Sequence, residues 1–511
     1  MFLEPTVVFW MLCGQALPNG ISFDYGQIEH EIQLGELQPA AVALENRLKN
    51  EDGDFRAHML LGIVRQEEGQ AEEALKELYR AQTLRPADPA PHVNLGKVLM
   101  SQGQPAKAIA EFEDAIRLDP RNATARINLG MLLFQQKKWP QAIAELKAAV
   151  AITPADAQNW FLIFQSYLAM RNFESARTAA AHLRVLSPPT SELFRAVGAS
   201  QAAAGDYEGA IPNLEEAMEA SPDSNETAYN LGLAWLRSGH PDKAAPLINA
   251  LAKREENAEV EDLLGEIDER LGLAIDAVRA FQKAAELDPG NEDYAFDYVS
   301  ELLAHKSFDA AILVARAAAD KLPSSLKLQL ALCGALYGNG NVEEAHGVAV
   351  DASQKFPESN LPLYLRNVIA DAGGNPDTSL LAQTKTYLEG HPKDATGWLI
   401  LGQAEARQGE PAEAMDSLNR SLAIKEESAE AHFAISRIYF DEGKWQQVVS
   451  HSRRAIELGL TSAVVRYRLS QALYRLGRKS EGDLEMKSYR DAHRVEEEKK
   501  SAVATFVYTL R

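Results

Sequence analysis

One small residue recurs along the chain at an almost constant interval. Every step between copies is 34 residues, apart from single steps of 33 and 35, and eleven of the fourteen residues are Ala. A register kept over so many copies is typical of a repeat array, in which one supersecondary unit is stacked on the next. The 511 residues therefore predict about fourteen helix–turn–helix units rather than several independent globular domains. The recurring positions are 40, 74, 108, 142, 176, 210, 244, 277, 311, 345, 379, 414, 448 and 482.

A glycine stands five residues before the small residue in most copies. This spacing predicts that the first helix of each unit ends in the left-handed conformation, which Gly adopts without a steric penalty, and that a short turn follows. Lys137, Arg171 and Lys306 occupy the same place in three copies. The glycines are Gly35, Gly69, Gly103, Gly205, Gly239, Gly272, Gly340, Gly374, Gly409, Gly443 and Gly477.

Two further positions are fixed relative to the small residue. Twelve residues before it, Gly recurs inside the first helix, where it costs about 1 kcal/mol relative to Ala. We expect the close approach of two helices to compensate, with the Gly and the Ala facing each other. Twelve residues after the small residue, Pro recurs, as at Pro86 and Pro120, and is expected to end the second helix. The internal glycines are Gly62, Gly96, Gly130, Gly198, Gly232, Gly265 and Gly402.

This pattern resembles the tetratricopeptide repeat. The copy with Asn94-Leu95-Gly96, Ala108, Phe112, Ala115 and Pro120 matches it best, and the eleventh copy matches it least, since Arg366 and Asn367 replace the aliphatic–Gly pair. The resemblance implies an all-α fold, a right-handed α-solenoid superhelix of antiparallel helix pairs whose first helices line a concave groove. We expect the solenoid to cover residues 21–495 as one undivided unit, with residues 496–511 as a C-terminal capping tail.

The composition and the absence of known motifs argue against nucleic-acid binding and against catalysis. The formal charge of −21 repels a polyanion, and no Lys- or Arg-rich stripe stands out in the sequence, so nucleic acid is not an expected partner. Metalloprotease, phosphate-loop, serine-hydrolase and dinucleotide motifs do not occur. The acidic pairs Glu72-Glu73, Glu215-Glu216 and Glu343-Glu344 are interpreted as dipole-complementing charges at the start of second helices. We therefore expect no catalysis, cofactor, metal or small-molecule substrate.

The N-terminus allows two interpretations. Residues 6–13 form an apolar run followed by Gly14-Gln15-Ala16, which fits a secretory signal within residues 1–20. Residues 1–5 carry Glu4 and no Lys or Arg, which favours an apolar N-terminal cap instead. The first interpretation predicts export to a bacterial-type periplasm, and the second predicts a cytoplasmic protein.

The cysteines Cys13 and Cys333 are far apart in sequence, and Cys333 falls at a packed helix interface. No segment is long and apolar enough to span a membrane.

Seven residues are candidates for a peptide-binding groove on the first helices. Asparagine can hydrogen-bond an extended peptide through both a donor and an acceptor. The apolar candidates suit an amphipathic helix or an apolar peptide. The alternative is that all of them are solvated groove residues without a dedicated ligand. The candidates are Asn94, Lys97, Asn128, Met131, Phe134, Phe161 and Asn230.

Two functions fit these observations. The first is a noncatalytic scaffold that binds protein or peptide partners in the groove. The second is an accessory or regulatory subunit of a cell-envelope enzyme, active only in complex. The Lys and Asn set with which some members of the family grip a C-terminal carboxylate is missing, since Met59, Val93, Ile127 and Phe161 stand at the corresponding positions.

Overall fold

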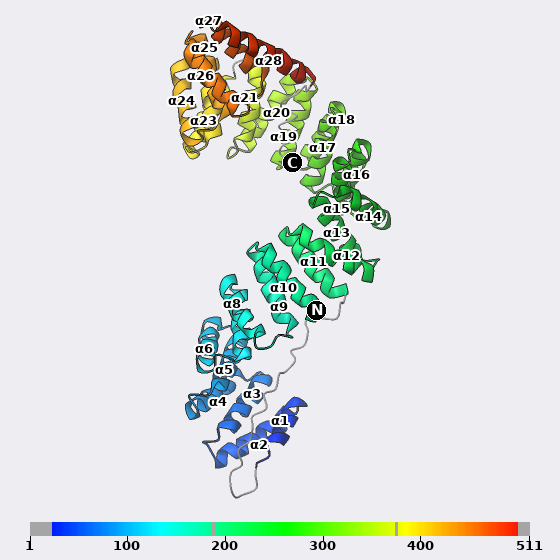
Figure 1. Ribbon diagram of the computed structural model, residues 1–511, viewed down its shortest axis with the longest axis vertical. Coiled ribbons are helices and arrows are strands. Elements are labelled where there is room, and N and C mark those ends of the chain that lie inside the picture. Colours follow the sequence, from blue (N-terminus) through cyan, green and yellow to red (C-terminus); the bar gives the residue numbers. More distant parts are fainter. Residues whose placement is uncertain (1–22, 187–190, 374–376, 499–511) are drawn as a thin grey trace. The chain divides into compact units, whose positions relative to one another are not determined.

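The chain folds into paired helices. The computed structural model describes residues 23–186, 191–373 and 377–498, and over these ranges it contains 28 α-helices and no strand (Figure 1). The predicted signal or cap at residues 1–20 and most of the predicted tail lie outside the described residues. The predicted all-α solenoid of helix pairs is confirmed.

The odd-numbered helices are the first helices of the units, and the even-numbered helices are the second helices. The first helices are α1 (Tyr25–Gln33), α3 (Phe55–Glu67), α5 (Pro89–Ser101), α7 (Ala123–Gln135), α9 (Ala157–Ala169), α11 (Ser191–Ala204), α13 (Asn225–Arg237), α15 (Ala258–Arg270), α17 (Glu292–Ala304), α19 (Leu326–Gly338), α21 (Leu361–Gly373), α23 (Ala395–Arg407), α25 (Ala429–Asp441) and α27 (Ala463–Arg475). The second helices are α2 (Leu37–Asn50), α4 (Ala71–Leu84), α6 (Pro105–Leu118), α8 (Trp139–Val150), α10 (Phe173–Leu186), α12 (Tyr207–Ala220), α14 (Pro241–Arg254), α16 (Ala274–Leu287), α18 (Phe308–Lys321), α20 (Val342–Lys355), α22 (Thr378–Gly390), α24 (Pro411–Ile424), α26 (Trp445–Glu457) and α28 (Lys479–Glu498).

The turn between the two helices of a unit has the predicted conformation. The turn glycines have φ between 68° and 86°, apart from Gly374, which lies outside the described residues. Lys137, Arg171 and Lys306 adopt the same left-handed conformation, with φ of 59°, 55° and 57°. The geometry of the turn therefore overrides the residue type. Turns this short place the two helices of each unit antiparallel.

The glycine inside the first helix faces a different residue from the one expected. A Cβ atom added at Gly96 would lie 2.6 Å from the Phe112 ring, and one added at Gly130 would lie 2.7 Å from Leu146. Phe112 and Leu146 stand one helical turn after the small residue of their units. The nearest atoms thus belong to a large side chain that reaches across the helix pair and covers the glycine, while the predicted approach to the backbone of the small residue occurs at Gly62 and Gly402, where Ala74 and Ala414 lie within 3.4 and 2.9 Å.

The close approach at Gly402 gives a prediction. A Cβ atom there would lie 2.7 Å from Leu418 and 2.9 Å from the carbonyl oxygen of Ala414, which is backbone and cannot rotate away. We expect Gly402→Ala to lower the free energy of unfolding by about 1–3 kcal/mol. Gly347 is the matched control, since it is exposed within α20 and has nothing within 4 Å. Gly347→Ala should raise stability by about 0.5–1 kcal/mol, and denaturant titration of both variants should show opposite signs.

The ends of the helices follow the sequence signals closely. Helices α4 and α6 end two residues before Pro86 and Pro120, as expected. Side chains such as Asp88 and Asn122 then cap the next first helix by accepting a hydrogen bond from its backbone N–H groups. The acidic pairs at 72–73 and 343–344 lie in first turns as predicted, but Glu215-Glu216 lies in the second half of α12. That interpretation was wrong, since Glu216 instead pairs with Arg184.

A polar pair links the two helices within several units. The partners are 19 residues apart, one in each helix. Nδ1 of His92 lies 2.8 Å from a carboxylate oxygen of Glu111, and Nδ1 of His58 lies 2.6 Å from Glu77. Arg126 donates to Glu145 over 2.5 Å at the same place in the next unit. Both histidines are buried, so the paired carboxylates supply the partners that buried imidazoles need.

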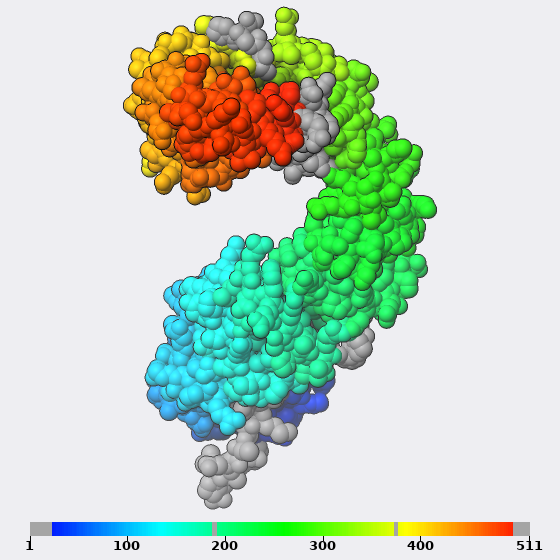
Figure 2. Space-filling view, turned by 45° about the horizontal axis from the view of Figure 1, so that its top comes forward, coloured from blue at the N-terminus to red at the C-terminus, as the bar shows by residue number. Residues whose placement is uncertain are grey.

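The chain divides into two compact units, residues 1–230 and 231–511, and the boundary between them falls inside α13. The expectation of one undivided solenoid over residues 21–495 stays a prediction. Within each unit the colours succeed one another in chain order in the space-filling view (Figure 2). Among the described residues, most contacts join helices of the same or neighbouring repeats, as expected of a stacked array. Cys333 is fully buried as predicted, and burial raises the pKa of its thiol to about 12. None of the described helices could cross a membrane.

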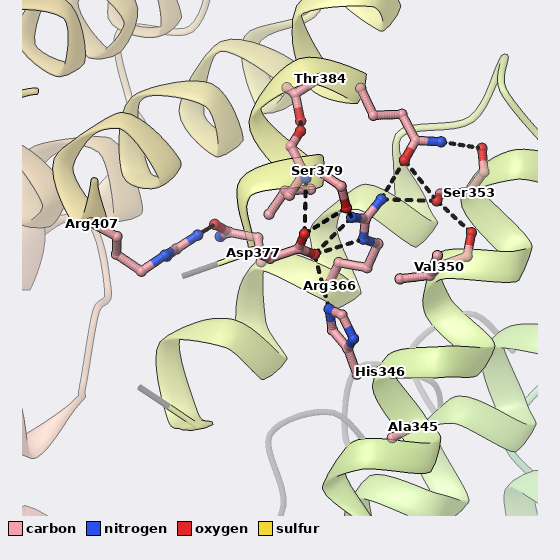
Figure 3. A network of polar contacts seen from close by, with 12 residues as sticks. Ala345, His346, Val350, Ser353, Arg366, Asp377, Ser379, Thr384 and Arg407 are labelled. Atoms are coloured by element: carbon pink, nitrogen blue, oxygen red, sulfur yellow. Dashed lines mark hydrogen bonds and ion pairs between the residues drawn. The ribbon is translucent and has the colours of Figure 1, made fainter. Parts of the chain in front are cut away.

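The eleventh unit, which matches the repeat least, is held by a buried polar network (Figure 3). Arg366 of α21 is completely buried. Its Nε and Nη2 atoms donate to Asp377 over 3.1 and 2.7 Å, and Nη2 also donates to Ser379 over 2.6 Å. Nη1 donates to Ser353 over 3.1 Å and to Gln383. All five guanidinium N–H groups are therefore satisfied.

The acidic partner in this network is also well supported. Asp377 accepts hydrogen bonds from Ser379 and from the backbone N–H of Leu380, and His346 lies 2.9 Å from it. Burial would raise the pKa of Asp377, but the hydrogen bonds from Ser379, His346 and Arg366 hold it well below the usual range. A buried ion pair with complete hydrogen bonding thus replaces the aliphatic–Gly packing of the other units.

Candidate peptide-binding groove

The first helices form the inner side of each stack. Among described residues, the helices of the same kind that come close in successive repeats are first helices, as α5 with α7 and α7 with α9. Second helices of successive units are farther apart, so they lie on the outer side. First helices therefore lie on the inner side, where the groove was predicted, and the groove itself stays a prediction.

Asn94 and Asn128 occupy equivalent places on α5 and α7. The Nδ2 atom of Asn94 donates to the carbonyl oxygen of Ala90 over 3.0 Å, and that of Asn128 donates to Thr124 over 2.8 Å. Each bond reaches back one turn of its own helix, so both side chains are held in the same orientation one repeat apart. Both are half-buried, and no partner for either Oδ1 atom occurs among the described residues.

The apolar candidates fall into two groups. Met131 of α7 and Phe161 of α9 are half-buried on consecutive first helices, and Phe161 lies with its ring centre 5.8 Å from that of Phe164. Phe134 lies edge-on to Trp139 at 5.1 Å and packs against the core of its own unit. Phe134 and Phe161 thus both pack against the cores beneath them, and the half-buried Met131 and Phe161 leave part of their apolar surface accessible on the first helices.

The two remaining candidates differ in position. Lys97 lies on α5 one turn after Asn94, and burial lowers the pKa of its ammonium group, while Glu67 of α3 acts in the opposite direction. Asn230 lies on α13, three repeats beyond α7, at the last residue of the N-terminal unit. The structure thus brings together six candidates on α5, α7 and α9 and leaves Asn230 apart from them.

Comparison with protein families decides the identity of the repeat. One model described as a tetratricopeptide repeat matches residues 93–157 and 372–429, and a second matches residues 65–115 and 201–267. The chain is a tetratricopeptide-repeat protein. The matched stretches include α5 and α7 of the candidate groove, and they include α22 of the eleventh unit but not Arg366 or Asn367 of α21. No curated protein sequence matches the chain.

Several solved structures of repeat proteins are similar to this tetratricopeptide-repeat protein. Cut9 with Hcn1, from an APC/C hetero-tetramer, is 17% identical, with 88% of this chain and 96% of that chain covered and a TM-score of 0.35. Yeast Tom70 is 14% identical, with coverage of 85% and 96% and a TM-score of 0.36. YrrB, described as having an unusual peptide-binding site, is 20% identical, with coverage of 37% and 96% and a TM-score of 0.33.

Sequence reasoning missed a set of arginines on the inner side of the C-terminal unit. Arg407, Arg437 and Arg468 lie on α23, α25 and α27, on three successive first helices. They are 30 and 31 residues apart, which is one repeat less about one helical turn. A linear search for basic stripes cannot find them, and because their spacing is shorter than the 34-residue repeat they do not share one repeat position either.

Proposed function

We propose that this tetratricopeptide-repeat protein is a noncatalytic scaffold that binds an extended apolar peptide along α5, α7 and α9. The observation that carries the proposal is the matched pair Asn94 and Asn128, held in one orientation on consecutive first helices with acceptor oxygens uncommitted. Packed helices lie about 8–10 Å apart, which is close to the length of about three residues of extended chain. A peptide could therefore meet Asn94 and Asn128 in succession as it passes from α5 to α7.

The apolar side chains beside these asparagines indicate the chemistry of the peptide. Met131 and Phe161 offer adaptable and flat apolar surfaces, and both remain partly accessible. Lys97 adds one partly buried cation at the edge of this surface. The combination favours a peptide with apolar side chains whose backbone hydrogen-bonds to the asparagines.

Selection from a random displayed peptide library, followed by affinity measurement, tests this function. We expect apolar peptides to be selected, and Asn94→Ala with Asn128→Ala together to weaken their binding on the order of tenfold, because two hydrogen bonds are lost. Asn249→Ala is the matched control, since Asn249 makes the same bond to Ala245 over 3.0 Å on a second helix. Failure to select any peptide, or equal loss in the control, would contradict the proposal.

A further inference from the structure

The three arginines of the C-terminal unit are partly buried on three successive first helices. The side chains of Arg407 and Arg437 are 15% and 31% exposed, although arginine side chains usually extend into water. Arg407 donates to the Oδ1 atom of Asn367 over 2.5 Å, which ties α23 to α21. The guanidinium of Arg468 lies 5.4 Å from the centre of the Phe433 ring. These contacts hold the three groups in place before any ligand arrives.

Few carboxylates compensate this positive charge. Asp371 accepts a hydrogen bond from Arg437 over 3.0 Å and lies 3.6 Å from Arg407, so one carboxylate serves two guanidinium groups. The Nη1 atom of Arg468 is buried and has no hydrogen-bond partner among the described residues. Burial lowers the pKa of both Arg407 and Arg468, and the charge of Arg437 lowers each further, although Asp371 opposes this at both and Asp441 opposes it at Arg468.

We infer that Arg407, Arg437 and Arg468 form a docking surface for an acidic protein segment, whose carboxylates approach the accessible part of this cluster. Buried charge is costly unless it is paired, and these carboxylates would add negative charge where Asp371 is shared between Arg437 and Arg407. Guanidinium groups bind carboxylates through two parallel hydrogen bonds, which favours Arg over Lys at such a place. This surface lies on α23, α25 and α27 and is independent of the groove on α5, α7 and α9.

Charge complementarity favours a short acidic segment over a nucleic acid. The whole chain carries a formal charge of −21, so a long polyanion is repelled by most of the molecule. A short segment with a few carboxylates meets the local positive field without extending over the acidic remainder.

Binding of fluorescent peptides to the full chain, measured by anisotropy, tests the inference. The probes are a short peptide of alternating Glu and Ser, the same peptide with Gln in place of Glu, and a single-stranded oligo-dT. We expect the Glu peptide to bind in a salt-sensitive way and the Gln peptide to bind on the order of tenfold more weakly or worse. Arg468→Gln should weaken binding of the Glu peptide on the order of tenfold, and Arg468→Lys should restore part of it.

Arg279→Gln is the matched control, because Arg279 lies on the second helix α16 and is 72% exposed. It should leave the affinity unchanged, and circular dichroism should show that every variant is folded. The inference is overturned if the Glu peptide does not bind at millimolar concentration, if the Gln peptide binds equally well, if oligo-dT binds more tightly than the Glu peptide, or if Arg468→Gln and Arg279→Gln behave alike.

Discussion

Arg366→Leu is expected to lower the free energy of unfolding of the C-terminal unit by about 3–5 kcal/mol. The substitution restores the aliphatic residue that other units carry, yet it removes the partner of a buried carboxylate. Arg366 is completely buried, and its guanidinium makes five hydrogen bonds to four side chains. Asp377 would keep its contacts with His346 and Ser379 but lose its cation. Chemical denaturation of the variant and the wild type measures the loss.

A double-mutant cycle separates the ion pair from simple packing. Asp377→Ser keeps an oxygen that can cap α22, where Asp377 accepts from Leu380 over 3.0 Å. The double variant with Arg366→Leu should lose less stability than the sum of the two single variants, because neither charge is then left unpaired. Strictly additive effects, or an unchanged midpoint for Arg366→Leu, would mean that the network does not stabilise the unit.

The second large effect concerns a buried carboxylate without a cationic partner. Asp268 of α15 is 5% exposed. Burial, with a smaller contribution from the Asp276 carboxylate, raises its pKa from 3.8 to about 6. The folded state therefore binds this proton more tightly than the unfolded state does. The stabilisation is complete below about pH 4 and is lost as the pH rises to about 6.

Above pH 6 the ionised carboxylate costs up to about 3 kcal/mol, since each unit of pKa corresponds to about 1.36 kcal/mol. Asp268→Asn removes this titration with little change of shape. We expect the variant to be more stable than the wild type by about 2–3 kcal/mol at pH 7.5, with the difference falling toward zero near pH 4. The exposed Asp320→Asn on α18 should stay within about 0.5 kcal/mol of the wild type throughout. A difference at position 268 that does not vary with pH would refute the assignment.

The fold could be predicted from the sequence because every repeat carries the residues that fix its own turn and helix ends. The turn position is left-handed in thirteen described copies, including Lys137, Arg171 and Lys306, because the antiparallel pair requires it. The sequence did not predict which side chains make the contacts between the two helices of a unit. The spacing marks Gly96 as a place of close approach, but it does not say that Phe112 rather than Ala108 fills the space.

The features that were missed depend on residues from several helices. The partners of Arg366 come from α20, from α22 and from Asp377 just before α22. The sequence therefore showed that the eleventh unit matches the repeat least, but it did not reveal what replaces the usual packing. The arginines on α23, α25 and α27 were not predicted as a cluster, because they also lie on three different helices. The groove candidates on α5, α7 and α9 were brought together because they follow the repeat. Export stays a prediction, since residues 6–16 lie outside the described residues.

Site-specific photo-crosslinking in living cells tests the central claim most directly. A benzophenone amino acid at Met131 lies within the proposed groove, and one at Arg117, which is 69% exposed on α6, reports on the outer side of neighbouring repeats. We predict a discrete crosslinked protein from position 131 that disappears when Asn94 and Asn128 are replaced by Ala, and none from position 117. Identical adducts from both positions, or an adduct from position 117 alone, would contradict a scaffold that binds its partner in the groove of α5, α7 and α9.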